Sequence, residues 1–196
     1  MQPEKLILAS GSPRRKELLT VLGLSFEVCV SEVLEDDRPE LNPKDLVLNN
    51  AVMKAESVMP KFPNALVVGS DTTVSLEGRI FSKPANLDEA GAMLRALSGR
   101  WHQVYTAVSM RWKEGAYAED FYEVSAVCFK ELSQSDINSY HALVNPLDKA
   151  GAYGIQAERD RVIASIRGSF ETIMGFPTEA FLHRLKERGF DFSKAN

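Results

Sequence analysis

The sequence predicts an α/β protein in which helices flank a mixed, twisted sheet. Two observations carry this prediction. Short apolar runs typical of buried strands alternate with segments that carry helix-start signals, and strand-turn-strand hairpins interrupt the alternation. Crossover units build parallel strand pairs and hairpins build antiparallel ones, so both kinds of pairing are expected in one sheet. Residues 1–196 contain no low-complexity linker and no internal repeat, and we expect a single domain.

Local signals place the elements of the first half. Strands are expected over residues 5–9, 26–30 and 65–71, and a hairpin over residues 72–81 turns at Glu77-Gly78. Ser12-Pro13 and Asn42-Pro43 are typical of helix starts, because a capping side chain precedes a proline at the first helical position. These helices are expected to reach Leu22 and about Met59, with an acidic loop over residues 31–41 between the second strand and the second helix.

The second half continues the alternation. Helices are expected after Asn86, ending at Ser98-Gly99, and after Ser133. Strands over residues 101–112 and 121–129 are joined by a polar turn near Gly115. A loop over residues 148–156, a strand over residues 161–166 and a helix from Pro177 to near Gly189 complete the order.

Composition excludes several classes of protein. The 23 basic and 27 acidic residues give a net charge of −4, which argues against a stable nucleic-acid partner. No window approaches the roughly 18 uninterrupted apolar residues of a membrane span. The apolar stretch before Ser12 is too short for a signal-peptide core, so we expect a cytoplasmic protein. Cys29 and Cys128 lie far apart in apolar runs, and buried free thiols are expected rather than a disulfide or a zinc site.

The first candidate site is Ala9-Ser-Gly-Ser-Pro-Arg-Arg15, where a strand ends and a helix begins. Backbone N–H groups and the helix dipole favour an anion at such a point. Arg14 and Arg15 stand in the first helical turn, where positive charge opposes the dipole, and a bound phosphate would offset that cost. A surface arginine pair is the alternative, because the segment is neither a Gly-x-Gly-x-x-Gly loop nor a Walker A loop.

Carboxylates and lysines form the second group of candidates. Asp71 at the end of its strand can hold a divalent metal or act as a base, and capping of the next turn is the alternative. Glu35 lies in the acidic loop, where a carboxylate is normally solvated. Lys54 and Lys83 are candidate phosphate cations, although lysines at such positions are usually solvated.

The third candidate is the loop Asp148-Lys-Ala-Gly-Ala-Tyr-Gly-Ile-Gln156. Such a loop can close on a heterocyclic base, because the Gln156 amide both donates and accepts hydrogen bonds. An ordinary glycine-containing turn is the alternative. The three histidines are scattered and are expected to serve packing or the surface. Together, the basic and acidic candidates fit a small substrate with several phosphates, and a metal.

Five motifs resemble those of the Maf-like family of nucleotide pyrophosphatases and follow in the family's order from about residue 6 to residue 188. They are Ser10-Gly-Ser-Pro-Arg-Arg-Lys-Glu-Leu-Leu19, Gly69-Ser-Asp-Thr-Thr-Val74 with Lys83-Pro84, Leu97-Ser-Gly-Arg-Trp-His-Gln-Val-Tyr-Thr106, Asp148 to Gln156, and Gly175-Phe-Pro177. Two departures stand out. The helix around Lys54 reads Val-Leu-Asn-Asn-Ala-Val-Met-Lys-Ala instead of the usual Leu-Ala-x-x-Lys-Ala, and no glycine-rich stretch follows Gln156.

The resemblance implies hydrolysis of a nucleoside triphosphate to the monophosphate and pyrophosphate with a divalent metal, Mg²⁺ or Mn²⁺. It also implies a fold similar to inosine-triphosphate pyrophosphatases, with the site in a cleft between two lobes. Family members are often cytoplasmic homodimers. A nucleotide- or nucleic-acid-binding regulator of cell division without turnover is the alternative.

The resemblance also implies roles for individual residues. Asp71 matches the position of the catalytic base, and Glu35 matches a metal ligand, with Glu32 as its competitor in the acidic loop. Arg14, Arg15, Lys54 and Lys83 match phosphate-contacting positions, and Ser10 belongs to the substrate-binding set. Arg14, Thr72 and Gln156 match three positions that separate branches of the family. Their identities are similar to the branch that prefers dTTP and UTP, and they differ from the branch that acts on 7-methyl-GTP.

Overall fold

The computed structural model describes residues 2–193, and its centre is one seven-stranded mixed sheet. The strands are β1 (Leu6–Leu8), β2 (Phe26–Val28), β3 (Leu66–Leu76), β4 (Arg79–Phe81), β5 (Trp101–Trp112), β6 (Tyr117–Phe129) and β7 (Ile163–Arg167). Their order is β2-β1-β3-β5-β6-β7, and β4 pairs with β3. β1 runs parallel to β2 and β3, whereas the other pairs are antiparallel, so the predicted mixture of pairings is confirmed.

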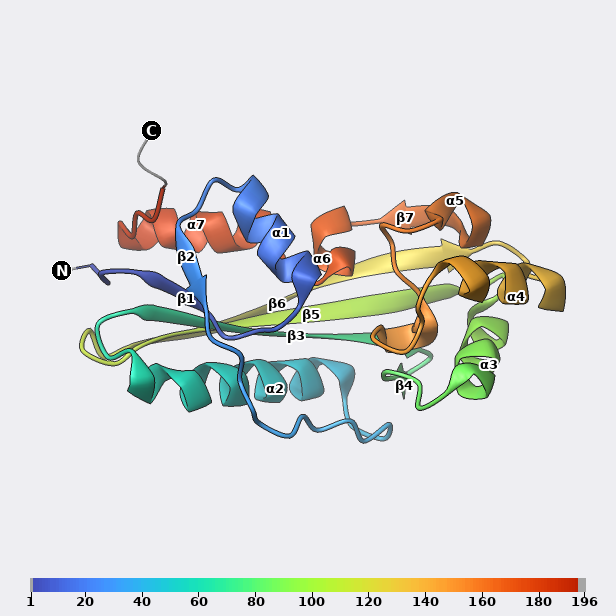
Figure 1. Cartoon of the computed structure of the whole chain (residues 1–196), viewed down its shortest axis with the longest axis horizontal. Helices are drawn as coiled ribbons and strands as arrows, with labels where there is room; N and C mark the ends of the chain where they lie inside the picture. The colour runs from blue at the N-terminus through green and yellow to red at the C-terminus, as the bar shows by residue number, and fades with distance from the viewer. Residues whose placement is uncertain (1, 194–196) are drawn as a thin grey trace.

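Helices cover the long strands β3, β5 and β6 on both sides (Figure 1). They are α1 (Pro13–Val21), α2 (Pro43–Val58), α3 (Leu87–Leu97), α4 (Gln134–Leu143), α5 (Arg159–Val162), α6 (Phe170–Met174) and α7 (Thr178–Arg188), with 3₁₀ turns η1 (Met59–Lys61) and η2 (Ala150–Ala152). α1 and α7 lie on the side of the sheet opposite α2, and α3, α4 and α5 gather toward the other end (Figure 1). Among the helices of residues 2–193, none combines the length and the apolar character that a bilayer crossing requires.

α2 packs against β3 along one continuous face. The predicted cap is present, since the Asn42 side chain accepts a hydrogen bond from the Lys44 N–H. The buried residues of α2 recur every three or four positions: Pro43, Leu46, Val47, Asn50, Ala51, Lys54, Ala55 and Val58. Gly69 of β3 permits the close approach, because a Cβ there would lie 2.2 Å from the Ala51 carbonyl oxygen. Two polar side chains, Asn50 and Lys54, are thus pressed against the sheet.

Several expected boundaries were wrong. The strand expected to end at Asp71 continues to Leu76, because its pairing with β5 continues as far as Ser75 and Gln103. The last strand begins at Ile163 rather than Arg161, after the short helix α5, which was not expected. α6 was also missed; the Ser169 side chain caps it and Gly175, in the left-handed conformation, ends it. Both cysteines are free as predicted, but half-buried rather than buried.

Candidate active site

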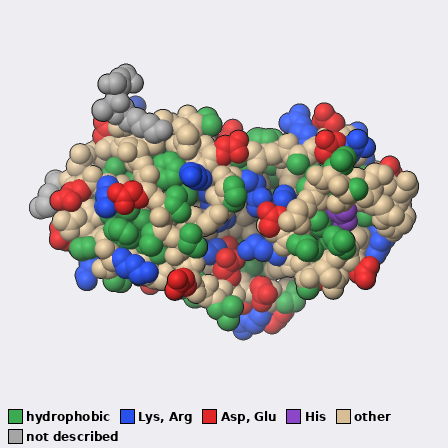
Figure 2. Space-filling model, viewed as in Figure 1, with side chains coloured by type: hydrophobic (Ala, Val, Ile, Leu, Met, Phe, Trp, Pro, Cys, Tyr) green, Lys and Arg blue, Asp and Glu red, His purple; other side chains and the backbone are tan. Residues whose placement is uncertain are grey.

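A cavity of about 700 Å³ opens where β1 leaves the sheet and β3 continues. Ala9 still donates its N–H to Val68, and the chain then turns away into α1. Asp71 and its neighbours on β3 therefore face a space that no further β1 residue fills, beyond the carboxyl end of a parallel strand. Figure 2 shows this hollow near the middle of the face in view, with basic and acidic side chains gathered around it.

Asp71 and Lys54 form a buried ion pair at the floor of the cavity. Lys54 Nζ lies 2.7 Å from Asp71 Oδ1 and 3.3 Å from the Ser70 carbonyl oxygen. Each side chain of the pair is 8% exposed. A buried pair with this geometry fixes both groups in place, because either charge left alone would be costly.

Glu35 reaches the same ammonium group from the acidic loop. Its Oε1 lies 3.1 Å from Lys54 Nζ, and its Oε2 lies 3.6 Å from Lys83 Nζ. Burial alone would raise the pKa of Glu35, but the charges of Lys54 and Lys83 outweigh it and hold the pKa below its ordinary value. Glu32 is exposed and does not line the cavity, so the structure places Glu35 rather than its competitor here.

Arg15 is buried and crosses from α1 to β3. Its Nη1 donates to Ser10 Oγ at 3.1 Å, its Nη2 to Thr72 Oγ1 at 3.1 Å, and its Nε to the Gly175 carbonyl at 2.9 Å. Burial lowers the pKa of Arg15, although Asp71 and Glu35 act against that change. Three of its five N–H groups thus have partners among residues 2–193, and Arg15 also lines the cavity.

The amino end of α1 faces the cavity. Ser12 occupies the predicted N-cap position, but its side chain makes no cap hydrogen bond; instead its N–H donates to Ser10 Oγ at 3.2 Å. Arg14, on the first turn, lies 3.3 Å from Asp148 Oδ2. An uncapped helix start beside two arginines is a favourable place for a phosphate.

Gln156 is the predicted site residue that does not line the cavity. Its side chain is exposed, and Nε2 donates to Glu17 Oε2 on α1 at 3.0 Å. The preceding residue, Ile155, does line the cavity. The other predicted site residues come together around the one space: Ser10, Arg14, Arg15, Glu35, Lys54, Asp71, Thr72 and Lys83.

Among the lining residues to which the sequence analysis gave no individual role are Asn50 and Lys149. Asn50 is 1% exposed, donates to Asp71 Oδ2 at 3.1 Å and to the Asp36 carbonyl at 2.8 Å, and accepts from the Asp36 N–H at 2.8 Å. Its signal was available, since it stands four residues before Lys54 and so on the same face of the helix. Lys149 belongs to the candidate loop from Asp148 to Gln156, but nothing in the sequence distinguished it from the other residues of that loop.

The donor set fits a hard divalent cation. Within residues 2–193, no three His, Cys, Asp or Glu side chains form a complete ligand cluster. Glu35 and Asp71 nevertheless lie on the same ammonium group, Lys54 Nζ, which shows that both carboxylates already converge on a cation. Mg²⁺ is usually held by one or two carboxylates together with substrate phosphates and water. This cavity supplies the two carboxylates, Glu35 and Asp71.

The Maf-like protein family matches residues 5–188. The chain belongs to this family. Two relatives named dTTP/UTP pyrophosphatase, from Bacillus cereus (strain B4264) and Bacillus anthracis (strain CDC 684 / NRRL 3495), are 43% and 42% identical to it. Each match covers 97% of this chain and 99% of the relative.

A solved structure supports the fold independently. The Staphylococcus aureus Ham1 protein matches 96% of this chain and 100% of its own with a TM-score of 0.51 and 16% identity. At that identity the likeness concerns the fold alone, and it confirms the fold class predicted for this Maf-like chain.

Proposed function

We propose that this Maf-like chain hydrolyses nucleoside triphosphates, dTTP and UTP above all, to the nucleoside monophosphate and pyrophosphate with a divalent cation. One observation carries the proposal: Asp71 faces a cavity whose walls also hold five basic side chains and the open start of α1. The names of the relatives support the same activity and the same two substrates.

The basic side chains have the role of binding the triphosphate. Arg14, Arg15 and Lys83 supply charge around the cavity, and Ser10 and the amino end of α1 supply further polar groups. Lys54 balances the buried charge of Asp71 and Glu35. Neutralising and orienting the phosphates is most of the work in phosphoryl chemistry, since the charge spreads over non-bridging oxygens.

Asp71 has the role of base. It accepts a proton from water, the water oxygen bonds to phosphorus, and the anhydride bond between the α- and β-phosphates breaks with release of pyrophosphate. Glu35 and Asp71 would hold the cation, which when bound would neutralise charge on the phosphate oxygens.

Base recognition falls to Arg14, Thr72 and Gln156. Uracil and thymine present two carbonyl oxygens flanking a ring N–H, and the Gln156 amide can pair with that edge once it leaves Glu17.

We also propose a cytoplasmic enzyme without a nucleic-acid partner that acts as a homodimer. This part rests on the family resemblance and the net charge of −4.

A panel of triphosphates tests the proposal. Each is incubated with Mg²⁺, with Mn²⁺ or with excess chelator, and pyrophosphate and orthophosphate are detected separately. We expect pyrophosphate from dTTP and UTP, less from the purine nucleotides, and none with chelator. Release of orthophosphate would contradict the proposed bond, and tight binding without any release would instead favour a non-catalytic regulator.

A further inference from the structure

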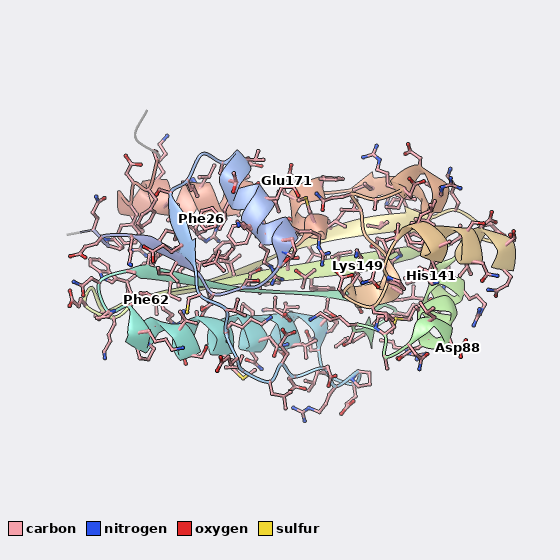
Figure 3. The ribbon with its side chains drawn as sticks, in the orientation of Figure 1. Phe26, Phe62, Asp88, His141, Lys149 and Glu171 are labelled. Atoms are coloured by element: carbon pink, nitrogen blue, oxygen red, sulfur yellow. The ribbon has the colours of Figure 1, made fainter. Side chains whose placement is uncertain are left out.

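Lys149 is a basic residue in the cavity wall that has no role in the reaction proposed above. It belongs to the loop between α4 and α5, where Figure 3 labels it. Its side chain is only 15% exposed, unlike Lys83 with 57%. Ordering a lysine side chain costs conformational entropy, so an immobilised lysine in a loop calls for a compensating interaction.

The stem of Lys149 lies across Gly154. A Cβ at residue 154 would stand 2.9 Å from Lys149 Cε and 3.1 Å from Cδ, which is too close for any side chain unless the lysine moves. The φ angle of Gly154 lies outside the left-handed region, so the backbone does not demand glycine there. A side chain at residue 154 would therefore displace the end of the lysine side chain from its present place.

The head of Lys149 is held at the cavity. Its Nζ lies 2.6 Å from Asp148 Oδ1 and donates to the Asn145 carbonyl at 2.8 Å. The other oxygen of Asp148 lies 3.3 Å from Arg14 Nη1. One carboxylate thus stands between two cations, from α1 and from the loop, and both cations line the cavity. Asp148 itself is half-exposed, and pairs this open to solvent contribute little to stability.

We propose that Lys149 and Arg14 form a phosphate-binding pair, in which the carboxylate of Asp148 holds the place that a substrate phosphate takes. The inference rests on the proposed function, because it adds a binding residue for the same triphosphate. Asp148 and a phosphate oxygen are both anionic acceptors, so the exchange keeps each cation paired while the carboxylate turns to solvent.

Kinetics with Lys149→Met test the binding role. We expect KM for UTP to rise about tenfold, the loss typical of one charge-assisted contact, with kcat within about twofold of wild type. Gly154→Ala should raise KM in the same direction, since its Cβ displaces the lysine. Lys130→Met is the matched control, because that ammonium group is bound to the Asp160 carbonyl and does not line the cavity; its KM should not change.

Calorimetry with inorganic tripolyphosphate separates this inference from the proposed function. We expect wild type to bind the probe and Lys149→Met to bind it about tenfold more weakly, whether or not UTP is hydrolysed. Asp148→Asn should bind it at least as tightly as wild type, because the competing carboxylate charge is gone. Equal affinity of wild type and Lys149→Met, or a loss in Asp148→Asn as large as in Lys149→Met, would overturn the proposal. Binding without turnover in wild type would instead overturn the proposed function alone.

Discussion

Two parts of the cavity wall hold charged groups in different ways. The inner wall, made of Asn50, Lys54 and Asp71, is buried, and the ion pair within it has side chains 8% exposed. The outer rim consists of Arg14, Asp148 and Lys149 in the wall, and the pair of Glu17 and Gln156 lies outside the lining beside it. This rim is more open; Arg14 is 26% and Asp148 50% exposed. Buried pairs cannot be exchanged cheaply, whereas exposed pairs contribute roughly 0–1 kcal/mol and exchange readily. The inner wall is suited to preorganised chemistry, and the outer rim to contacts that the substrate replaces.

The largest expected effect is on the stability of the inner wall. Lys54→Met leaves Asp71 buried without its partner, and we expect a loss of about 3–5 kcal/mol in unfolding free energy. The double variant with Asp71→Asn should recover most of this, because neither member of the pair is then left as an unpaired buried charge. Lys83→Met, at a 57% exposed position, should lose less than about 1 kcal/mol. Denaturant unfolding measures the stability of all three variants. Equal losses in Lys54→Met and Lys83→Met would contradict the expected difference between the buried and the exposed ion pairs.

The second prediction concerns the buried underside of the outer rim. Tyr153 of the loop shares a hydrogen bond with His102 at 2.9 Å, and burial lowers the pKa of His102 from 6.5 to about 4. As the pH falls, His102 therefore binds a proton at a higher pH in the unfolded chain than in the folded one. The neutral imidazole stabilises the fold above pH 6.5, and this contribution is lost as the pH falls toward 4. We expect it to remove about 2 kcal/mol between pH 7.5 and pH 5.

Unfolding curves of His102→Gln against pH measure this contribution. The variant should lose less stability than wild type between pH 7.5 and pH 5, whatever its stability at neutral pH. His183→Gln, at a position 66% exposed, should follow the wild-type curve. If the unfolding free energy of His102→Gln depends on pH as steeply as that of wild type, then burial of His102 is not the source of this pH dependence.

The smallest expected effect lies at the exposed edge of the rim. We expect wild type to prefer UTP over 7-methyl-GTP by about 10²-fold, because two mismatched polar groups cost roughly 1–3 kcal/mol each. Gln156→Glu removes the donor, repels the pyrimidine carbonyls and should reduce that ratio about tenfold. The ratio of kcat/KM values measures it. An unchanged ratio would remove Gln156 from base recognition, and a wild-type preference for 7-methyl-GTP would overturn the choice of branch.

The sequence correctly predicts the elements that are defined by local signals. The prolines at the starts of α1, α2 and α7 and the Asn42 cap of α2 act within a few residues, and the hairpin turn at Gly78 does as well. Boundaries set by partners elsewhere were missed, since the length of β3 depends on its pairing with β5. The short helices α5 and α6 carry too few residues to show a period.

The candidate site divides in the same way. Asp71, Lys54 and the arginines were found as residue types in motifs, but their distances depend on contacts between distant parts of the chain. Glu17 and Gln156 are 139 residues apart in sequence, and only the packing of α1 beside the loop brings them together. The role of Asn50 could have been predicted from the sequence, because a polar residue on a largely apolar helical face needs a hydrogen-bond partner when it is buried.

The central claim is that the buried inner wall carries the chemistry, whereas the outer rim makes contacts that the substrate replaces. Two single variants, each of which neutralises one aspartate, test this claim most directly. Asp71→Asn and Asp148→Asn are nearly isosteric changes at two cavity carboxylates, one in each part of the wall. We expect kcat for UTP to fall roughly 10²–10⁴-fold in Asp71→Asn, because the base and a cation ligand are lost together. In Asp148→Asn it should stay within about threefold of wild type, since exposed pairs contribute little. If Asp71→Asn keeps more than about a tenth of the wild-type rate with the same metal requirement, its role as base is wrong.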